Sequence, residues 1–359
     1  MLLARLTLVD LRNYEALSFE PPEGLSLLVG PNGQGKSNLL EAIALLATAK
    51  SFRTSHEREL IRDGCERATV AGDVVLQAGV VRLGCTIARN GAGTRKTYAV
   101  NGKGVRFASY LGNARVVTFV PADLDLAGGA PAARRTFLNA ALAQEDRAYY
   151  ASLAAYQKYV TQKNAMLRGA IGFDGDLLDT YDERLAQTGA ALVAARRRYV
   201  DELADAAAAA YDRIAGGRDG GLRVRYAPNA SEDELPDRIK AARPLETARR
   251  RALVGPHRDD LELALGERPL AAYGSQGQQR SAVLALKIAE YNVMTARSGE
   301  PPLLLLDDVL SELDPERQAA FLGALDGLRQ AFVTATVRPQ GVDEAATYRV
   351  EAARVERVA

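Results

Sequence analysis

Residues 30–37, which read GPNGQGKS, constrain this chain more than any other segment because they match the phosphate-binding loop pattern G-x-x-x-x-G-K-[S/T] in full. An apolar run at 25–29 precedes them, and apolar residues follow at helical spacing over 39–46. This is the strand–loop–helix context in which such loops fold around phosphates. We therefore predict that the chain binds a nucleoside triphosphate.

The residues of this loop have different expected roles. Gly30 and Gly35 let the backbone close around the phosphates, so that successive N–H groups face the anion. Lys36 is expected to reach the β- and γ-phosphates and to take part in catalysis, and Ser37 is expected to ligate Mg²⁺. The predicted ATP contacts in this segment are Gly30, Pro31, Asn32, Gly33, Gln34, Gly35, Lys36, Ser37 and Asn38.

A second feature of nucleotide sites lies near the other end of the chain, where the apolar run Leu303–Leu306 ends in Asp307 and Asp308. Such a run is typical of a buried parallel strand. Ligands bind at the carboxyl edge of a parallel sheet. We therefore expect Asp307 to be the partner of Mg²⁺ and Asp308 to be the carboxylate that polarises the attacking water.

Residues 273–280, which read YGSQGQQR, open an apolar helix and resemble the signature motif of ABC-type ATPases, with glutamine where glycine is usual. In those enzymes the signature loop caps the γ-phosphate bound by the other subunit. Ser275, Gly277 and Gln278 are therefore expected nucleotide contacts across a dimer. Residues 311–314, which read SELD, resemble the D-loop of the same enzymes. The order of these motifs predicts an α/β fold of the ABC-type ATPase head class.

Composition sets limits on this reading. At 359 residues the chain is long enough for about two structural units. Its formal net charge of +1 gives no global basic field, so a nucleic-acid surface would have to be local. No apolar run approaches the roughly 18 residues that span a bilayer, and the N-terminus lacks the shape of a signal peptide. We expect a cytoplasmic protein with no membrane partner, in which Cys65 and Cys85 are core residues.

Periodicity changes twice along the chain. Residues 1–122 are mostly strand-like, 123–252 are Ala-rich and helical, and 253–359 alternate between strands and helices, which predicts an ATPase head split by an inserted helical arm lobe. Two helical segments with matching heptad spacing flank residues 169–175, which fits either an antiparallel helical hairpin or two core helices of a compact lobe. The predicted strands are 69–76, 80–87, 98–100, 116–120, 260–265, 303–306 and 331–333, with a hairpin-turn signal at Asn101-Gly102.

Four further motifs point to one family: LRNY at 11–14, KSFR at 50–53, RRTFLN at 134–139 and GPHRDD at 255–260. With them the chain resembles, over essentially its whole length, the RecF family of DNA-repair ATPases, which are SMC-like without a long coiled coil. The resemblance implies that Arg12 and Asn13 contribute to nucleotide binding. It also implies ATP-dependent homodimerisation on DNA, sequence-independent recognition of duplex next to single-stranded gaps, and help in loading RecA with RecR and RecO in DNA replication, DNA damage repair and the SOS response.

Three departures from the ABC-type pattern predict slow turnover. Asp308 stands where glutamate is usual and is one methylene shorter, which places the water less well. Thr334 or Thr336 stands where a switch histidine is usual, and no glutamine marks a Q-loop near residues 116–123. We therefore expect a weak, DNA-stimulated ATPase in which ATP acts as a timer.

Some alternatives stay open at the level of sequence. The arginine runs at 196–198 and 249–251 fit either phosphate contacts or solvated helix faces, and His257 fits either a structural or a functional role. The ATPase subunit of a membrane transporter would carry a Q-loop glutamine and a switch histidine. An SMC-like structural protein would need heptads over hundreds of residues. Both are therefore weaker alternatives to a DNA-repair ATPase.

Overall fold

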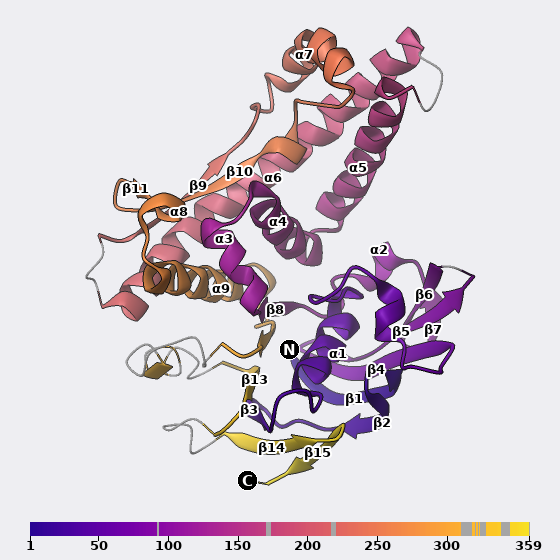
Figure 1. Cartoon of the computed structure of the whole chain (residues 1–359), viewed down its shortest axis with the longest axis vertical. Helices are drawn as coiled ribbons and strands as arrows, with labels where there is room; N and C mark the ends of the chain where they lie inside the picture. Colours follow the sequence, from indigo (N-terminus) through magenta and orange to yellow (C-terminus); the bar gives the residue numbers. More distant parts are fainter. Residues whose placement is uncertain are drawn as a thin grey trace. The chain divides into compact units, whose positions relative to one another are not determined.

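The computed structural model describes residues 1–91, 93–169, 174–216, 220–309, 318–319, 321, 323, 328–338 and 345–358. Within these residues the chain forms two units, drawn in Figure 1. Unit 1 comprises Met1–Asp123, Arg213–Gly216 and Lys287–Ala359, and unit 2 comprises Leu124–Asp212 and Gly217–Leu286. The boundaries at residues 122 and 252 expected from the sequence remain a prediction, because these units describe how the chain packs and not which parts fold independently.

Unit 1 contains a six-stranded sheet whose order is β15-β14-β3-β13-β12-β8. Its strands are β3 (Gly24–Val29), β8 (Val116–Phe119), β12 (Leu303–Leu306), β13 (Gln330–Ala335), β14 (Ala346–Glu351) and β15 (Arg354–Arg357). All neighbours pair in parallel except β15, which is antiparallel to β14. Every residue of β12 is buried, as its continuous apolar run predicts.

A second sheet of unit 1 is antiparallel throughout, with the order β2-β1-β4-β5-β6-β7. Its strands are β1 (Leu2–Leu11), β2 (Tyr14–Phe19), β4 (Arg67–Leu76), β5 (Gly79–Asn90), β6 (Gly93–Val100) and β7 (Lys103–Val105). The predicted hairpin turn is confirmed, because Asn101 and Gly102 connect β6 to β7 with φ values of 51° and 76°. Both positive angles match the turn that suits the twist of paired strands.

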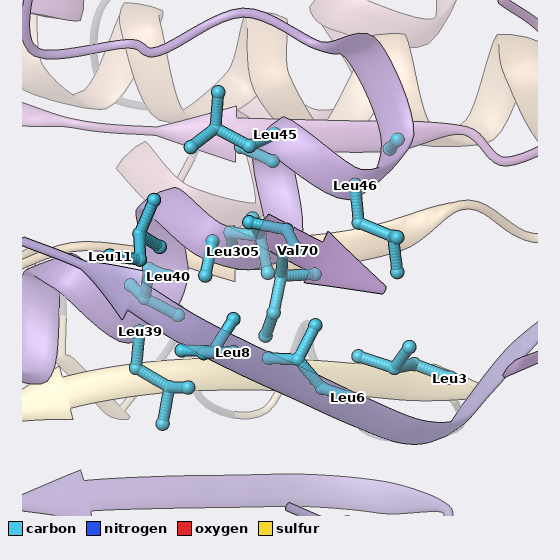
Figure 2. Close-up of a cluster of buried hydrophobic side chains, with 14 of the residues drawn as sticks. Leu3, Leu6, Leu8, Leu11, Leu39, Leu40, Leu45, Leu46, Val70 and Leu305 are labelled. Atoms are coloured by element: carbon cyan, nitrogen blue, oxygen red, sulfur yellow. The ribbon is translucent and has the colours of Figure 1, made fainter. Parts of the chain in front are cut away.

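Helix α1 (Lys36–Thr48) lies in the core of unit 1, and it is buried on nearly all sides. Its leucines meet side chains of both sheets, which Figure 2 shows for Leu8 of β1, Val70 of β4 and Leu305 of β12. A helix that is apolar on nearly all sides is typical of a buried core element. The first turn of α1, which carries the lysine and serine of the loop motif, therefore starts from a helix anchored in the core of unit 1. The shorter elements of this part are η1 (Glu57–Leu60), α2 (Phe107–Tyr110) and η2 (Pro121–Leu124).

Unit 2 is mainly helical. Its helices are α3 (Asp125–Gly128), α4 (Pro131–Glu145), α5 (Arg147–Leu167), α7 (Leu235–Arg249), η3 (Pro256–Arg258) and α8 (Leu270–Tyr273), with parts of α6 (Gly175–Ala215) and α9 (Gln276–Ser298). A small antiparallel sheet has the order β11-β10-β9, formed by β9 (Leu222–Ala227), β10 (Asp260–Leu265) and β11 (Arg268–Pro269). β10 has its predicted bounds, whereas β9 lies within a segment expected to be helical.

Helices α5 and α6 run antiparallel (Figure 1). The Tyr149 hydroxyl near the start of α5 accepts a 3.1 Å hydrogen bond from Arg196 Nε, and Lys163 Nζ near its end lies 2.6 Å from Asp182. Lys163 also lies 2.5 Å from Glu246 of α7. The two alternatives left open by the heptad spacing therefore coincide: the helices form an antiparallel hairpin, and a third helix packs on it within a compact lobe.

Candidate functional site

The loop at 30–35 leaves β3 and enters α1, and neighbouring side chains crowd its last residue. Gly35 is the residue before the helix and has φ 118°, which favours glycine. A Cβ added to Gly35 would lie 2.9 Å from both Asn13 Nδ2 and the Tyr14 hydroxyl. The backbone conformation of the loop thus depends on glycine at this position, as the motif predicts.

Lys36 is only 8% exposed, and its ammonium turns back over the loop. Its Nζ donates hydrogen bonds to the carbonyl oxygens of Gly30 (2.6 Å) and Pro31 (2.8 Å). Burial lowers the pKa of Lys36 below its usual range, and the charges of Asp308 and Asp307 oppose that shift. A charged amine over the mouth of the loop is well placed to exchange these carbonyls for phosphate oxygens.

The predicted magnesium ligands meet directly. The Ser37 hydroxyl donates a 2.7 Å hydrogen bond to Oδ1 of Asp307, across 270 positions of sequence. The Thr334 hydroxyl donates a 2.9 Å bond to the same oxygen and accepts one of 2.8 Å from the backbone N–H of Asp308. Strands β12 and β13 pair in parallel with Leu306 opposite Val333, so the two residues that follow, Asp307 and Thr334, lie side by side.

A cavity of about 380 Å³ opens at this point. Its lining residues are Asn32, Gly33, Gly35, Lys36, Ser37, Asn38, Arg53, Asp308 and Thr334. Most of them were predicted from the loop and the acidic strand. Arg53 was not predicted as a site residue, although it ends the KSFR motif. Its guanidinium hydrogen-bonds the Asn38 side chain and lies 3.9 Å from Glu41.

The donor set fits a magnesium ion that is shared with a nucleotide. Among the described residues no group of three or more His, Cys, Asp and Glu side chains could hold a metal alone. Mg²⁺ in nucleotide sites is usually held by one or two protein oxygens, with phosphates and waters completing the shell. Ser37 and Asp307 supply such a pair.

Asn13 contacts the loop and Arg12 contacts helix α1. The Arg12 guanidinium forms two hydrogen bonds with the buried carboxylate of Glu41, at 2.8 and 2.9 Å. Asn13 Nδ2 donates to the Gln34 carbonyl at 3.2 Å, and Asn13 Oδ1 accepts from Asn38 at 2.7 Å. Neither residue lines the cavity, so their expected contact with a nucleotide stays a prediction.

The signature residues belong to unit 2, which is described separately from the cavity. Ser275 Oγ accepts a 3.2 Å hydrogen bond from the Gln278 N–H, and Gln278 Oε1 accepts a 2.9 Å bond from the Ser275 N–H. These reciprocal bonds form a capping box at the start of α9. Ser275 and Gln278 thus have a local structural role, and a trans contact with nucleotide by them and Gly277 stays a prediction. The D-loop residues 311–314 lie outside the described residues.

Arg196 and His257, whose roles the sequence left open, have partners within unit 2. Arg196 is neither a phosphate contact nor a solvated residue, because it is 2% exposed and lies 2.9 Å from the buried carboxylate of Asp259. Its neighbour Arg197 pairs with Glu232 at 2.9 Å. His257 Nδ1 lies 2.7 Å from the Tyr156 hydroxyl, and desolvation lowers its pKa to about 4. The cysteines are free, with Cys85 buried and Cys65 partly buried.

Comparison with known proteins decides the family. The family model described as RecF/RecN/SMC N terminal domain matches residues 2–357. The chain belongs to the RecF family. A DNA replication and repair protein RecF from Symbiobacterium thermophilum is 40% identical over 354 residues, covering 94% of this chain and 92% of the relative. The RecF of Roseiflexus castenholzii is also 40% identical, over 369 residues, with 94% and 93% covered.

Solved structures agree with this assignment. A structure of the recombination mediator protein RecF with ATP in the RecFOR pathway superposes with a TM-score of 0.89 at 31% identity, covering 99% of this chain and 97% of that one. The SMC head of Pyrococcus furiosus shares the fold alone, with a TM-score of 0.57 at 14% identity, covering 99% of this chain and 95% of that one. The predicted α/β fold of an ABC-type, SMC-like head is confirmed. In the part of the chain that the structure describes, we find no helix long and apolar enough to cross a membrane.

Proposed function

We propose that this RecF-family chain binds ATP with Mg²⁺ in the cavity beside α1. Lys36 would reach the β- and γ-phosphates, and Ser37 and Asp307 would hold the ion. One observation carries this proposal: the hydroxyl of Ser37 lies 2.7 Å from the carboxylate of Asp307, beside the cavity. The two residues belong to separate sequence motifs, each of which predicts a magnesium ligand. The RecF relative solved with ATP supports the choice of nucleotide.

We further propose that the bound ATP is hydrolysed slowly, with stimulation by DNA. Asp308 lines the cavity and stands where ABC-type enzymes usually carry glutamate. Thr334 or Thr336 stands where a switch histidine is usual, and the Thr334 hydroxyl already bonds Asp307 and the N–H of Asp308. A hydroxyl in this position supplies no positive charge to the γ-phosphate in the transition state. ATP therefore acts as a timer.

The timer would control a homodimer on DNA. Ser275, Gly277 and Gln278 of each subunit would cap the ATP of the other, and the dimer would hold duplex next to single-stranded gaps without reading sequence. RecR and RecO would be its partners in loading RecA, which the placement of the solved relative in the RecFOR pathway supports. The transporter and SMC-like structural alternatives are weaker, since the RecF likeness spans the whole chain and α5, the shorter helix of the hairpin, has only 21 residues.

The test of nucleotide binding is Lys36→Met. This change removes the buried ammonium that faces the phosphates, and we expect it to weaken ATP binding at least tenfold, about 1.4 kcal/mol, in a fluorescence titration. Lys103→Met changes an exposed lysine of β7 in the same unit and should leave the affinity unchanged. Equal affinities of the parent and Lys36→Met would remove Lys36 from the site.

A further inference from the structure

The turn between β14 and β15 touches the phosphate-binding loop. Strand β14 runs parallel to β3, with Arg349 opposite Val29, so the segments that continue both strands lie side by side. The approach is close enough that a Cβ added to Gly30 would overlap the carbonyl oxygen of Val350. The C-terminal hairpin is therefore a direct neighbour of the loop, although more than 300 residues separate them in sequence.

Two backbone N–H groups of this turn are bonded to one loop residue. The N–H of Ala352 donates to Gln34 Oε1 at 2.8 Å, and the N–H of Ala353 donates to the Gln34 carbonyl at 3.1 Å. The Asn13 side chain donates to the same carbonyl at 3.2 Å. Both the side chain and the main chain of Gln34 are thus held from outside the cavity.

The turn adopts an unfavourable backbone conformation to present these groups. Ala352 and Ala353 have φ values of 48° and 59°, in the left-handed region where alanine is disfavoured. By contrast, the two-residue turn between β6 and β7 uses Asn101 and Gly102, the residues such turns prefer. Backbone strain of this kind persists only where the surrounding structure fixes it, and it is concentrated at functional sites.

We infer that the β14–β15 turn positions the phosphate-binding loop for ATP by fixing the peptide unit between Gln34 and Gly35. The inference rests on the proposed function. Because a trans peptide places its C=O and N–H on opposite sides, a Gln34 carbonyl tethered to the turn directs the Gly35 N–H away from it. Gly35 lines the cavity, where such an N–H faces a phosphate. Gln34 is on this account a positioning residue that acts through Gly35.

The test displaces the two N–H groups without removing the hairpin. Insertion of one glycine between Ala352 and Ala353 lengthens the turn, and the matched control inserts one glycine between Asn101 and Gly102. We expect the first insertion to raise the Kd for ATP about tenfold and the control to change it less than twofold, while the melting temperature without nucleotide stays near that of the parent in both. Equal Kd values for the two insertions would overturn the inference.

Point variants separate positioning from direct contact. Gln34→Met keeps the size of the side chain but loses the acceptor of Ala352, and it should weaken ATP binding. In the insertion background it should add nothing, because the tether is already broken. If the two changes weaken ATP binding additively, the inference is contradicted. If the insertion variant does not fold, a Gln34→Met variant that binds ATP with the parental affinity is enough to contradict it. Ala353→Gly keeps the N–H and suits a positive φ, so it should keep the parental Kd.

Failure of this inference can be distinguished from failure of the proposed function. If the parent binds ATP and Lys36→Met does not, the site is in use, and an unaffected insertion variant contradicts only the positioning role. If the parent itself binds no ATP, the proposed function is wrong, and the positioning role is wrong with it.

Discussion

The hydroxyl of Thr334 donates a 2.9 Å hydrogen bond to Oδ1 of Asp307. The same carboxylate oxygen accepts a hydrogen bond from Ser37, and the Thr334 oxygen accepts one from the N–H of Asp308. One buried threonine therefore fixes the side chain of the first acid and the backbone of the second. Thr334, one of the two threonines found where ABC-type enzymes usually carry histidine, thus organises both carboxylates.

Thr334→Val should disorganise the acids without changing the shape of the core. The change removes the hydroxyl that bonds both Asp307 and the Asp308 N–H, and each hydrogen bond lost costs about 1 kcal/mol. We expect ATP hydrolysis to fall at least tenfold and more Mg²⁺ to be needed for ATP binding. Steady-state hydrolysis over a Mg²⁺ titration measures both. Thr334→Ser retains the hydroxyl and is the control, and a Val variant as active as the Ser variant would contradict this role.

Asp308→Asn should separate ATP binding from release. The backbone of Asp308 has φ 55°, a conformation that asparagine tolerates as well as aspartate, so the change removes charge with little strain. The parent should turn over well below the median enzyme rate of about 10 per second. The variant should bind ATP and dimerise, yet dissociate more slowly from gapped duplex after dilution. Asp307→Asn should instead lose Mg²⁺ and the ATP-dependent dimer. Parental dissociation of Asp308→Asn would show that hydrolysis does not time release.

Ser275→Asp should abolish the ATP-dependent dimer while keeping the helix intact. Aspartate caps helices as well as serine does, whereas an arginine here would lose the cap, at about 1 kcal/mol. The added negative charge would repel the γ-phosphate of the opposite subunit. Sedimentation with ATP should show a dimer for the parent and for Ser275→Thr, and a monomer for Ser275→Asp that still binds ATP. A stable dimer of Ser275→Asp would contradict capping in trans.

His257 should make the fold sensitive to acid. Desolvation lowers its pKa to about 4 in the folded protein, below the usual 6.5. The unfolded chain therefore binds more protons between these values, so the free energy of unfolding falls as the pH drops from about 6.5 to about 4, by up to about 3 kcal/mol. Urea unfolding of the parent and His257→Gln across this range measures the difference. His56→Gln, which changes an exposed histidine, should behave like the parent.

Local sequence patterns were sufficient to predict those strands and turns that depend on residues close together in sequence. The bounds of β10 and β12 follow from short apolar runs with polar ends, and the Asn101-Gly102 turn follows from the residues its angles require. β9 was missed although Leu222, Val224 and Tyr226 alternate with arginines, because Ala-rich helices surround it. The S-x-x-Q capping box at Ser275 was likewise readable but was interpreted only as part of the signature.

Contacts between segments that are distant in sequence could not be predicted from local patterns. The burial of Arg196 depends on Asp259, which is brought to it by the folding of unit 2, and nothing next to Arg196 in sequence indicates this. The bond between Thr334 and Asp307 depends on the register of β12 and β13. The support of Gln34 by Ala352 depends on β14 lying beside β3. For the same reason the sequence identified the loop but not the residues that hold it.

The place of β3 between β13 and β14 also sets a time at which the ATP site can form. At synthesis rates of about 5–20 residues per second, β3 leaves the ribosome at least roughly 15 seconds before its first sheet neighbour. During that interval the GPNGQGKS segment lacks the two parallel strands that flank β3 in the folded protein. A nascent chain of this protein should therefore be unable to capture nucleotide until its last strands emerge, and the ribosome-bound intermediate would expose an apolar strand for which chaperones are the natural partner.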